Sequence, residues 1–201
     1  MIAKPNPEKN LFVLFYLNSI YPLGSGLKSY LSGKIKSCSF NKNEIISKKG
    51  EICNRLYFIK TGMVRGYFKI DSTEITTWID SENEVFTSIT GFFRNEPTRE
   101  YIQSLEETHC DYLEYEDYKY CLNNFSEMRQ IYRILLEEYY MLAEHRVYLA
   151  RIPNAKKRLN FFIENLNPNI INRIPKKYLA SYLAMRPETL SRLLKEKKIT
   201  S

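Results

Sequence analysis

The sequence is poor in the residues that build metal and redox centres. It has two histidines, His109 and His145, and four cysteines among 201 residues, with no Cys-x-x-Cys pair. Zinc and iron–sulfur sites need these side chains clustered at short spacings, so the sequence gives such sites little support. We therefore expect reduced thiols, as in a cytoplasmic protein, at all four cysteines: Cys38, Cys53, Cys110 and Cys121.

Motifs typical of enzymes are missing as well. The chain has no glycine-rich phosphate loop, no nucleophile elbow and no pair of carboxylates at a useful spacing. A metal-dependent enzyme on a jelly-roll scaffold needs two or three histidines and a carboxylate, whereas the two histidines here fall in different predicted elements. We predict a protein that is not an enzyme and keep the jelly-roll metal enzyme as the alternative.

Long hydrophobic runs and internal repeats are also lacking. The longest apolar run, Leu11 to Leu17, is too short to cross a bilayer and is predicted to be part of a buried helix. No membrane partner is therefore expected. Apolar residues nevertheless make up 44% of the chain, which is enough to build a sizeable core and argues against disorder.

What the chain does have is an uneven charge. Residues 1–150 hold 18 basic and 20 acidic side chains, a net charge of −2, and residues 151–201 hold 12 basic and 3 acidic ones, a net charge of +9. A near-neutral body with a strongly basic end indicates a polyanionic partner for that end.

The residue pattern that indicates secondary structure changes twice along the chain. Helical patterns over residues 10–21 and 27–35 precede short β-rich segments that begin near Ser37 and end near Tyr115. The clearest β-hairpin is predicted in LYFIKTGMVRGYF, with Thr61 and Gly62 at the turn. Seven or eight short strands at this spacing favour a closed roll or sandwich over βαβ units.

A long uninterrupted helix is predicted over residues 126–151. Leucine or methionine recurs there every seven residues, with tyrosines between, which is typical of a coiled-coil seam. An ordinary amphipathic helix that packs on its own core is the alternative. We predict a dimer interface at these positions: Met128, Tyr132, Leu135, Tyr139, Leu142 and Leu149.

The basic end reads as a pair of short helices. Pro153 ends the long helix after Ile152, a candidate hinge, and a helix over residues 155–166 and a loop over 167–175 follow. The pair runs from Pro175 to Leu183 and onward from Pro187, with Ala184 and Met185 at the joint.

The second of these helices carries a polar face. Glu188, Ser191, Arg192 and Lys195 are spaced to share one side. In a DNA major groove, Arg192 can donate twice to guanine and Glu188 can accept from the amino group of cytosine. Three further side chains are predicted to contact phosphates together with Lys195: Thr189, Lys176 and Lys177.

This order of elements resembles the Crp/Fnr family of bacterial transcription regulators. The stretches KGEICNRLYFIKTGMVRGYF, with Gly50 and Gly62 at the turns, and RPETLSRLLK carry the resemblance. It implies an α+β protein with a β-roll sensor domain and N-terminal helices over residues 1–125, a dimerisation helix over 126–151, and a helix-turn-helix domain over 152–201. Within the family, Glu188, Thr189 and Arg192 match operator-contacting positions.

The resemblance also implies partners and shows departures. It implies a cytoplasmic homodimer that binds a pseudo-palindromic double-stranded DNA site and contacts RNA polymerase. Pro187 stands where the family often has arginine, Ala184 stands where it usually has glycine, and the full β-hairpin wing after the recognition helix has no counterpart.

The predicted effector site is altered. Family members that bind cyclic nucleotides carry a Gly-Glu pair and an Arg-Ser/Thr pair, and here Phe86-Thr87-Ser88 and Arg99-Glu100 replace them. A carboxylate beside a phosphate would repel it, so no cofactor is assigned and cyclic AMP is disfavoured. Another small ligand, or none, is expected at the candidate pocket residues: Arg99, Thr87, Ser88 and Arg94. A ligand-sensing module whose basic end meets a protein or a membrane surface remains a further alternative.

Overall fold

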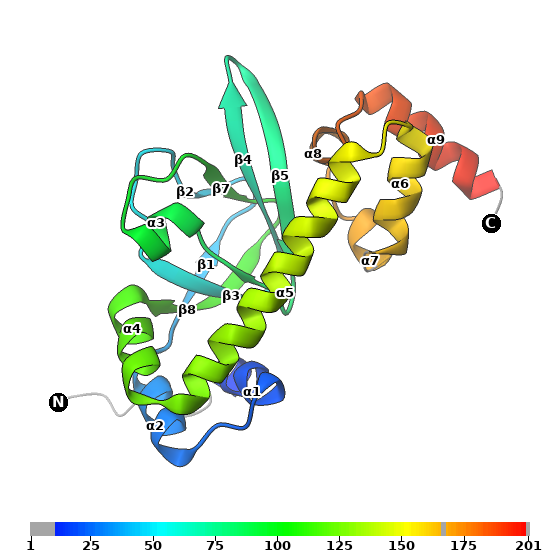
Figure 1. Ribbon diagram of the computed structural model, residues 1–201. Coiled ribbons are helices and arrows are strands. Elements are labelled where there is room, and N and C mark those ends of the chain that lie inside the picture. Colours follow the sequence, from blue (N-terminus) through cyan, green and yellow to red (C-terminus); the bar gives the residue numbers. More distant parts are fainter. Residues whose placement is uncertain (1–10, 166–167, 200–201) are drawn as a thin grey trace.

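The protein is described here by a computed structural model that covers residues 11–165 and 168–199 (Figure 1). Two N-terminal helices, α1 (Leu11–Ile20) and α2 (Ser25–Lys34), precede a β-roll. A long helix crosses the roll diagonally and leads to a cluster of helices at the C-terminal end. The order of elements is the one expected from the sequence.

Two four-stranded antiparallel sheets form the roll. One has the order β1-β8-β3-β6 and the other β2-β7-β4-β5. Their bounds are β1 (Lys36–Phe40), β2 (Ile45–Ser47), β3 (Arg55–Thr61), β4 (Met63–Ile70), β5 (Thr73–Ser81), β6 (Val85–Phe86), β7 (Tyr101–Ser104) and β8 (Thr108–Glu114). The predicted β segments all contain strands, and the α+β fold class is confirmed.

The predicted hairpin between β3 and β4 is wrong, although both strands exist. They lie in different sheets: β3 pairs with β6 and β8, whereas β4 pairs with β5 and β7. Between them, Gly62 has φ +103°, and a Cβ there would lie only 2.5 Å from the Thr108 hydroxyl oxygen. Gly62 therefore lets the chain pass close to β8 and change sheets, a tertiary event that looks like a hairpin turn in the sequence.

The hairpin that does form joins β4 to β5. Its turn contains Asp71 at φ +52°, a conformation that aspartate tolerates better than most residues. Lower in the same ladder, Gly66 lies opposite Trp78, whose ring would be 2.1 Å from any Cβ at residue 66. The missing side chain thus gives the indole of Trp78 its place across the sheet.

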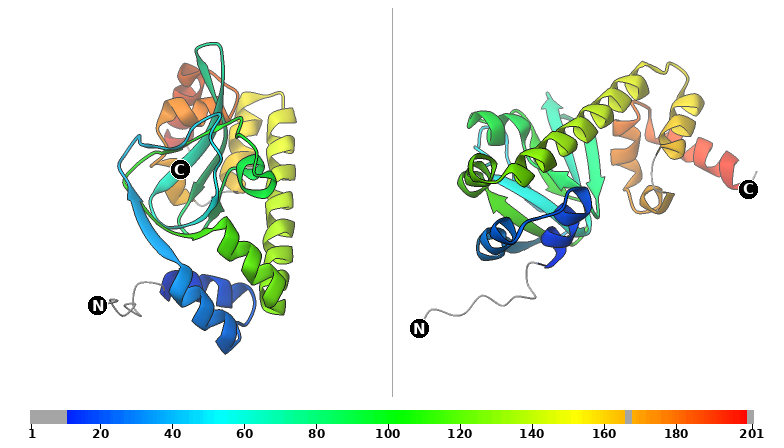
Figure 2. Two further views of the ribbon diagram at one scale, coloured as in Figure 1. Left: turned by 90° about the vertical axis from the view of Figure 1, so that its left-hand side faces the viewer. Right: turned by 60° about the horizontal axis from the view of Figure 1, so that its bottom comes forward.

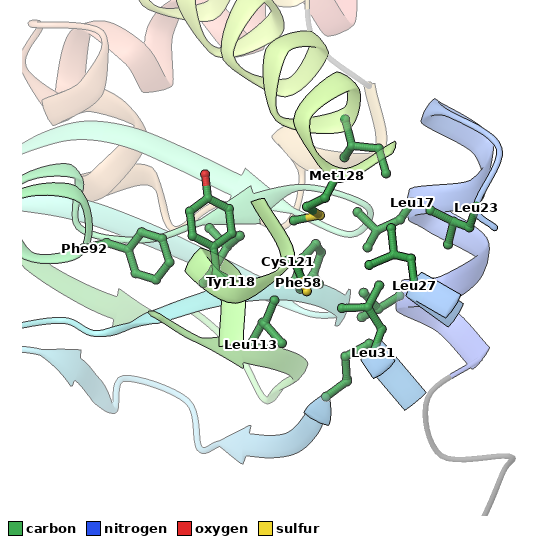
Figure 3. Close-up of a cluster of buried hydrophobic side chains, with 14 residues drawn as sticks. Leu17, Leu23, Leu27, Leu31, Phe58, Phe92, Leu113, Tyr118, Cys121 and Met128 are labelled. Carbon is green, nitrogen blue, oxygen red and sulfur yellow. The ribbon is translucent and has the colours of Figure 1, made fainter. Parts of the chain in front are cut away.

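Three further helices belong to the part of the chain that contains the roll. They are α3 (Ile89–Arg94), α4 (Tyr115–Asn124) and α5 (Ser126–Arg151). One end of α5 joins the roll to the N-terminal helices through a buried core that includes Leu17, Leu27, Phe58 and Met128 (Figure 3). Burial of each such side chain contributes about 1.5–3 kcal/mol, so the N-terminal helices and the start of α5 are held firmly to the roll.

The C-terminal domain contains α6 (Ala155–Glu164), α7 (Pro168–Ile171), α8 (Lys176–Tyr182) and α9 (Pro187–Ile199). The loop predicted over residues 167–175 is wrong in part, because Pro168 begins the short helix α7. Leu166, expected on the apolar face of α6, lies outside the described residues. Leu159 and Phe162 of that face are buried, as expected.

The structure also bears on the cysteines, on membrane-spanning helices and on metal sites. All four cysteines are free thiols. Within residues 11–165 and 168–199, no helix has the length and apolar character to cross a membrane, and no group of three or more potential ligands could hold a metal ion.

Candidate nucleic-acid interface and effector cavity

Helices α8 and α9 form a helix-turn-helix pair around a small apolar core. Leu179, Leu183 and Leu190 are almost completely buried, and Ala180 gives α9 room to cross. The amide of Met185 donates to the carbonyl of Ala180 at 3.0 Å, and the amide of Leu190 donates to that of Arg186 at 3.1 Å. Backbone hydrogen bonds thus close the turn between the two helices.

A buried arginine holds the joint of this pair, and sequence reasoning missed it. Arg158 of α6 donates from Nε to the carbonyl of Leu183 at 2.5 Å and from Nη2 to that of Ala184 at 2.9 Å. Its Nη1 also reaches the carbonyl of Ile152 at 2.5 Å. One guanidinium therefore ties the end of α5 to the turn, whereas in the sequence Arg158 looks like another charge on a solvated face.

The predicted polar face of α9 points to solvent. Glu188, Arg192 and Lys195 are exposed, and Ser191 and Thr189 are partly exposed. The Arg192 guanidinium lies 3.2 Å from Glu196 one turn further on, an ion pair on the surface that costs little to break. The side chain is therefore free to move toward a nucleic-acid base.

The lysines at the start of α8 flank this face. Lys176 and Lys177 are exposed, and the Lys177 ammonium lies 4.4 Å from the ring centre of Tyr178. Arg186, just before α9, is also exposed and was not among the predicted contact residues. Arg186 directly precedes Pro187, the first residue of α9, and this position could have identified it as a contact residue.

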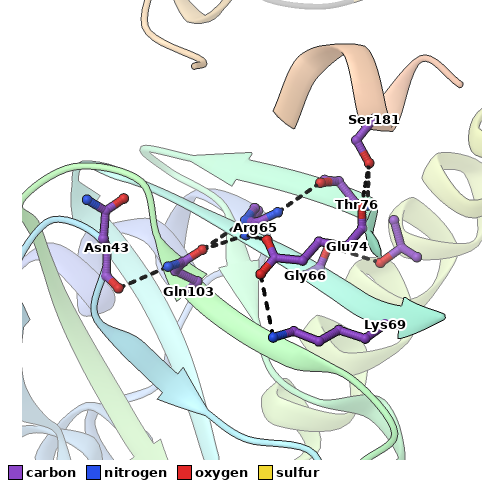
Figure 4. A network of polar contacts seen from close by, with 9 residues as sticks. Asn43, Arg65, Gly66, Lys69, Glu74, Thr76, Gln103 and Ser181 are labelled. Atoms are coloured by element: carbon purple, nitrogen blue, oxygen red, sulfur yellow. Dashed lines mark hydrogen bonds and ion pairs between the residues drawn. The ribbon is translucent and has the colours of Figure 1, made fainter. Parts of the chain in front are cut away.

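The helix-turn-helix pair docks directly on β5 of the roll (Figure 4). The hydroxyl of Ser181 in α8 accepts from the amide of Thr76 at 3.0 Å and donates to the carbonyl of Glu74 at 3.1 Å. The fully buried Arg65 guanidinium lies between two rings, 4.0 Å from the centre of Tyr67 in the roll and 3.5 Å from that of Tyr178 in α8. The roll and the helical domain thus share one polar core.

A second contact between the domains is ionic. Arg173, between α7 and α8, donates two hydrogen bonds to the carboxylate of Glu82, at 2.7 and 2.9 Å, and also pairs with Glu106. These bonds from Arg173 lower the pKa of Glu82 to about 2. The docked arrangement is therefore favoured whenever Glu82 is ionised.

A cavity of about 440 Å³ lies between α5 and the roll. Aromatic and aliphatic side chains dominate its wall, among them Phe58, Trp78, Phe86 and Phe93. Three carboxylates and one guanidinium also line it: Asp80, Glu84, Glu138 and Arg146. Its size is typical of a small-molecule site.

Three of the four predicted effector-pocket residues do not line this cavity. Arg94 and Arg99 are exposed and do not line the cavity, so no arginine from the cassette reaches it. Ser88 caps α3 and donates to Thr98 at 2.6 Å, and it is not part of the wall either. Only Thr87 lines the cavity. Next to the exposed Arg99, Glu100 turns inward and accepts from the Trp78 indole at 3.0 Å.

The predicted dimer seam on α5 is covered only in part by the chain's own domains. Met128 and Leu149 are buried in the two cores that α5 shares with the rest of the chain. Between them, Tyr139 and Leu142 line the cavity but are still 39% and 48% exposed. The dimer interface predicted at these positions and at Tyr132 and Leu135 therefore stays a prediction.

A second apolar strip on α5 lies beside this seam, and its first residue, Leu136, also lines the cavity. Leu136, Tyr140, Ala143 and Val147 follow one another at spacings of four, three and four residues, the spacing of a coiled-coil seam. The three large side chains are 48%, 73% and 56% exposed. We call these four residues the outer strip.

Comparison with known proteins agrees with this architecture. Residues 37–125 match the model of the cyclic nucleotide-binding domain family. FixK2 from Bradyrhizobium japonicum is 18% identical, with a TM-score of 0.69 over 83% of this chain and 85% of the other. A CooA mutant from Carboxydothermus hydrogenoformans is 19% identical, with a TM-score of 0.67 over 93% and 84%. No curated protein sequence matches the chain.

A regulator of the Crp/Fnr family from Eubacterium rectale gives a similar result, with 18% identity and a TM-score of 0.68 over 90% of this chain and 88% of the other. At these identities the likeness establishes the fold. The chain therefore has the fold expected from its resemblance to Crp/Fnr regulators, and residues 37–125 match the cyclic nucleotide-binding domain within it.

Proposed function

We propose that this protein, which has the fold of the Crp/Fnr regulators, is a homodimeric transcription regulator that binds specific DNA sequences in the cytoplasm. The observation that carries the proposal is the α8–α9 pair, whose second helix exposes Glu188 and Arg192 on a domain of strongly positive charge. Arginine reads guanine and glutamate reads cytosine in the major groove, which is wide enough for one helix.

Dimerisation through the outer strip of α5 is the second part of the proposal. A single helix-turn-helix module offers few base contacts, and a twofold pair doubles them on a pseudo-palindromic site. The outer strip supplies an apolar surface with coiled-coil spacing, and the exposed Tyr139 and Leu142 of the predicted seam lie on the same helix. RNA polymerase would be the partner through which the bound dimer acts.

Selection of DNA from a random pool by the full chain tests the proposal. The expected product is a pseudo-palindrome with half-sites about one helical turn apart. Affinity for this DNA should fall steeply with salt, because contacts to phosphates release counterions. Recovery of unrelated sequences, or affinity that does not change with salt, would contradict the proposal.

A further inference from the structure

The cavity between α5 and the roll has the wrong charge for a nucleotide. Asp80 of β5, Glu84 of the β5–β6 turn and Glu138 of α5 all line it, against two basic side chains, the guanidinium of Arg146 and the imidazole of His145. Glu100 directly follows Arg99, the predicted phosphate-binding arginine. It accepts a hydrogen bond from the Trp78 indole and adds a fourth carboxylate near the cavity. An anion that entered this space would meet net repulsion.

The carboxylates converge from different elements. Glu84 and Glu138 both act electrostatically on the Tyr16 hydroxyl, and Glu84 and Glu100 act on Asp80. Among the described residues, neither Asp80 nor Glu84 forms an ion pair. Burial raises the pKa of both carboxyls, and Glu84 raises that of Asp80 further, whereas the hydrogen bonds of Ser81 to Glu84 and the charge of Arg146 oppose this rise. The ionised forms of the two carboxyls would therefore be stabilised by a cation that entered the cavity.

The remainder of the wall suits an apolar body. Aromatic rings from the roll, α1, α3 and α5 surround the space, and aromatic faces attract organic cations. We propose that this cavity binds a small organic cation, an amine with an aromatic or aliphatic body, whose ammonium group lies between Asp80 and Glu84 and whose body contacts Trp78 and its neighbours.

This inference rests on the proposed function only in that an occupied cavity would regulate DNA binding. The cavity lies between the roll and α5, and α5 leads through Ile152 and the Arg158 clamp to the helix-turn-helix. Ligand binding itself can be measured without DNA. A failure to bind ligand and a failure to bind DNA are therefore distinguishable.

Three probes with the same body isolate the charge of the ligand: 4-phenylbutylamine, 4-phenylbutanol and 4-phenylbutyrate. Trp78, the only tryptophan of the chain, lines the cavity, so its fluorescence reports binding by the full chain directly. Charge-assisted hydrogen bonds in a partly buried site correspond to about tenfold or more in affinity. The amine should therefore bind at least about tenfold more tightly than the alcohol, and the carboxylate more weakly than both.

Variants of the cavity carboxylates test whether these side chains cause the preference for the amine. Asp80→Asn and Glu84→Gln should each reduce the preference for the amine over the alcohol while the affinity for the alcohol stays the same. Glu96→Gln removes an exposed carboxylate near α3 that does not line the cavity, and it should leave all three affinities unchanged. Tighter binding of the carboxylate, or no binding of any probe because the protein itself or a second copy fills the space, would overturn the proposal.

Discussion

At the scale of single residues, Arg192 carries the sharpest consequence for DNA recognition. Arg192→Ala should lower affinity for the selected site by about 1–3 kcal/mol and relax the preference at one base position, because a bidentate contact to guanine is lost. Lys195→Ala, which removes a phosphate contact, should weaken binding equally for all sequences. Competition titrations with single-base variants of the site measure both, and an unchanged preference in Arg192→Ala would refute the assigned orientation of α9.

The joint of the helix-turn-helix contains a strained residue. Ala184 has φ +46°, in a region that glycine adopts more readily than alanine. Ala184→Gly should therefore raise the free energy of unfolding by up to about 1 kcal/mol. Ala180→Gly in the buried part of α8 is the control and should lower it by about 1 kcal/mol. Urea unfolding measures both, and a destabilised Ala184→Gly variant would show that the strain is absent in solution.

At the scale of elements, α5 carries two neighbouring apolar strips. The seam that recurs every seven residues is buried at its two ends and exposed at Tyr139 and Leu142, and the large side chains of the outer strip are exposed as well. Figure 2 shows α5 running along one side of the roll, where a second copy could approach it.

Charge in the outer strip should separate the subunits. Tyr140→Glu combined with Val147→Glu places four carboxylates in the proposed interface of two helices, and like charges in such a seam oppose association. Sedimentation analysis should then show monomers with an unchanged fold. Ile70→Glu, at an exposed position that ends β4, should leave the dimer intact. A double variant that remains dimeric would place the interface elsewhere.

At the scale of the whole molecule, two contacts join the roll to the helical domain: the polar core around Arg65 and the ion pair of Arg173 with Glu82. The ion pair should make stability depend on pH. Because Arg173 lowers the pKa of Glu82 to about 2, its contribution is present above the ordinary carboxyl value and is lost as the pH falls toward 2.

Glu82→Gln tests this contact. The wild type should be more stable than the variant by about 1 kcal/mol or less at neutral pH, because the pair is partly exposed. The difference should shrink below about pH 4.5 and disappear near pH 2. Urea unfolding across this range measures it, with Glu96→Gln as a variant whose difference should not change in this way. A difference that is constant with pH would mean that the two domains do not dock through this pair.

The sequence by itself determined the types of elements, their order and the polar face of α9. These follow from local patterns: alternation in strands, helical spacing of leucines, and prolines at helix starts. Only the tertiary structure decided that β3 and β4 enter different sheets, that the two ends of the seven-residue seam of α5 are buried, and that Arg158 is buried. It also decided that the side chain of Glu100, and not that of Arg99, turns toward the interior of the roll. Each of these depends on contacts between segments far apart in the chain, and a local pattern carries no information about which surface will meet which.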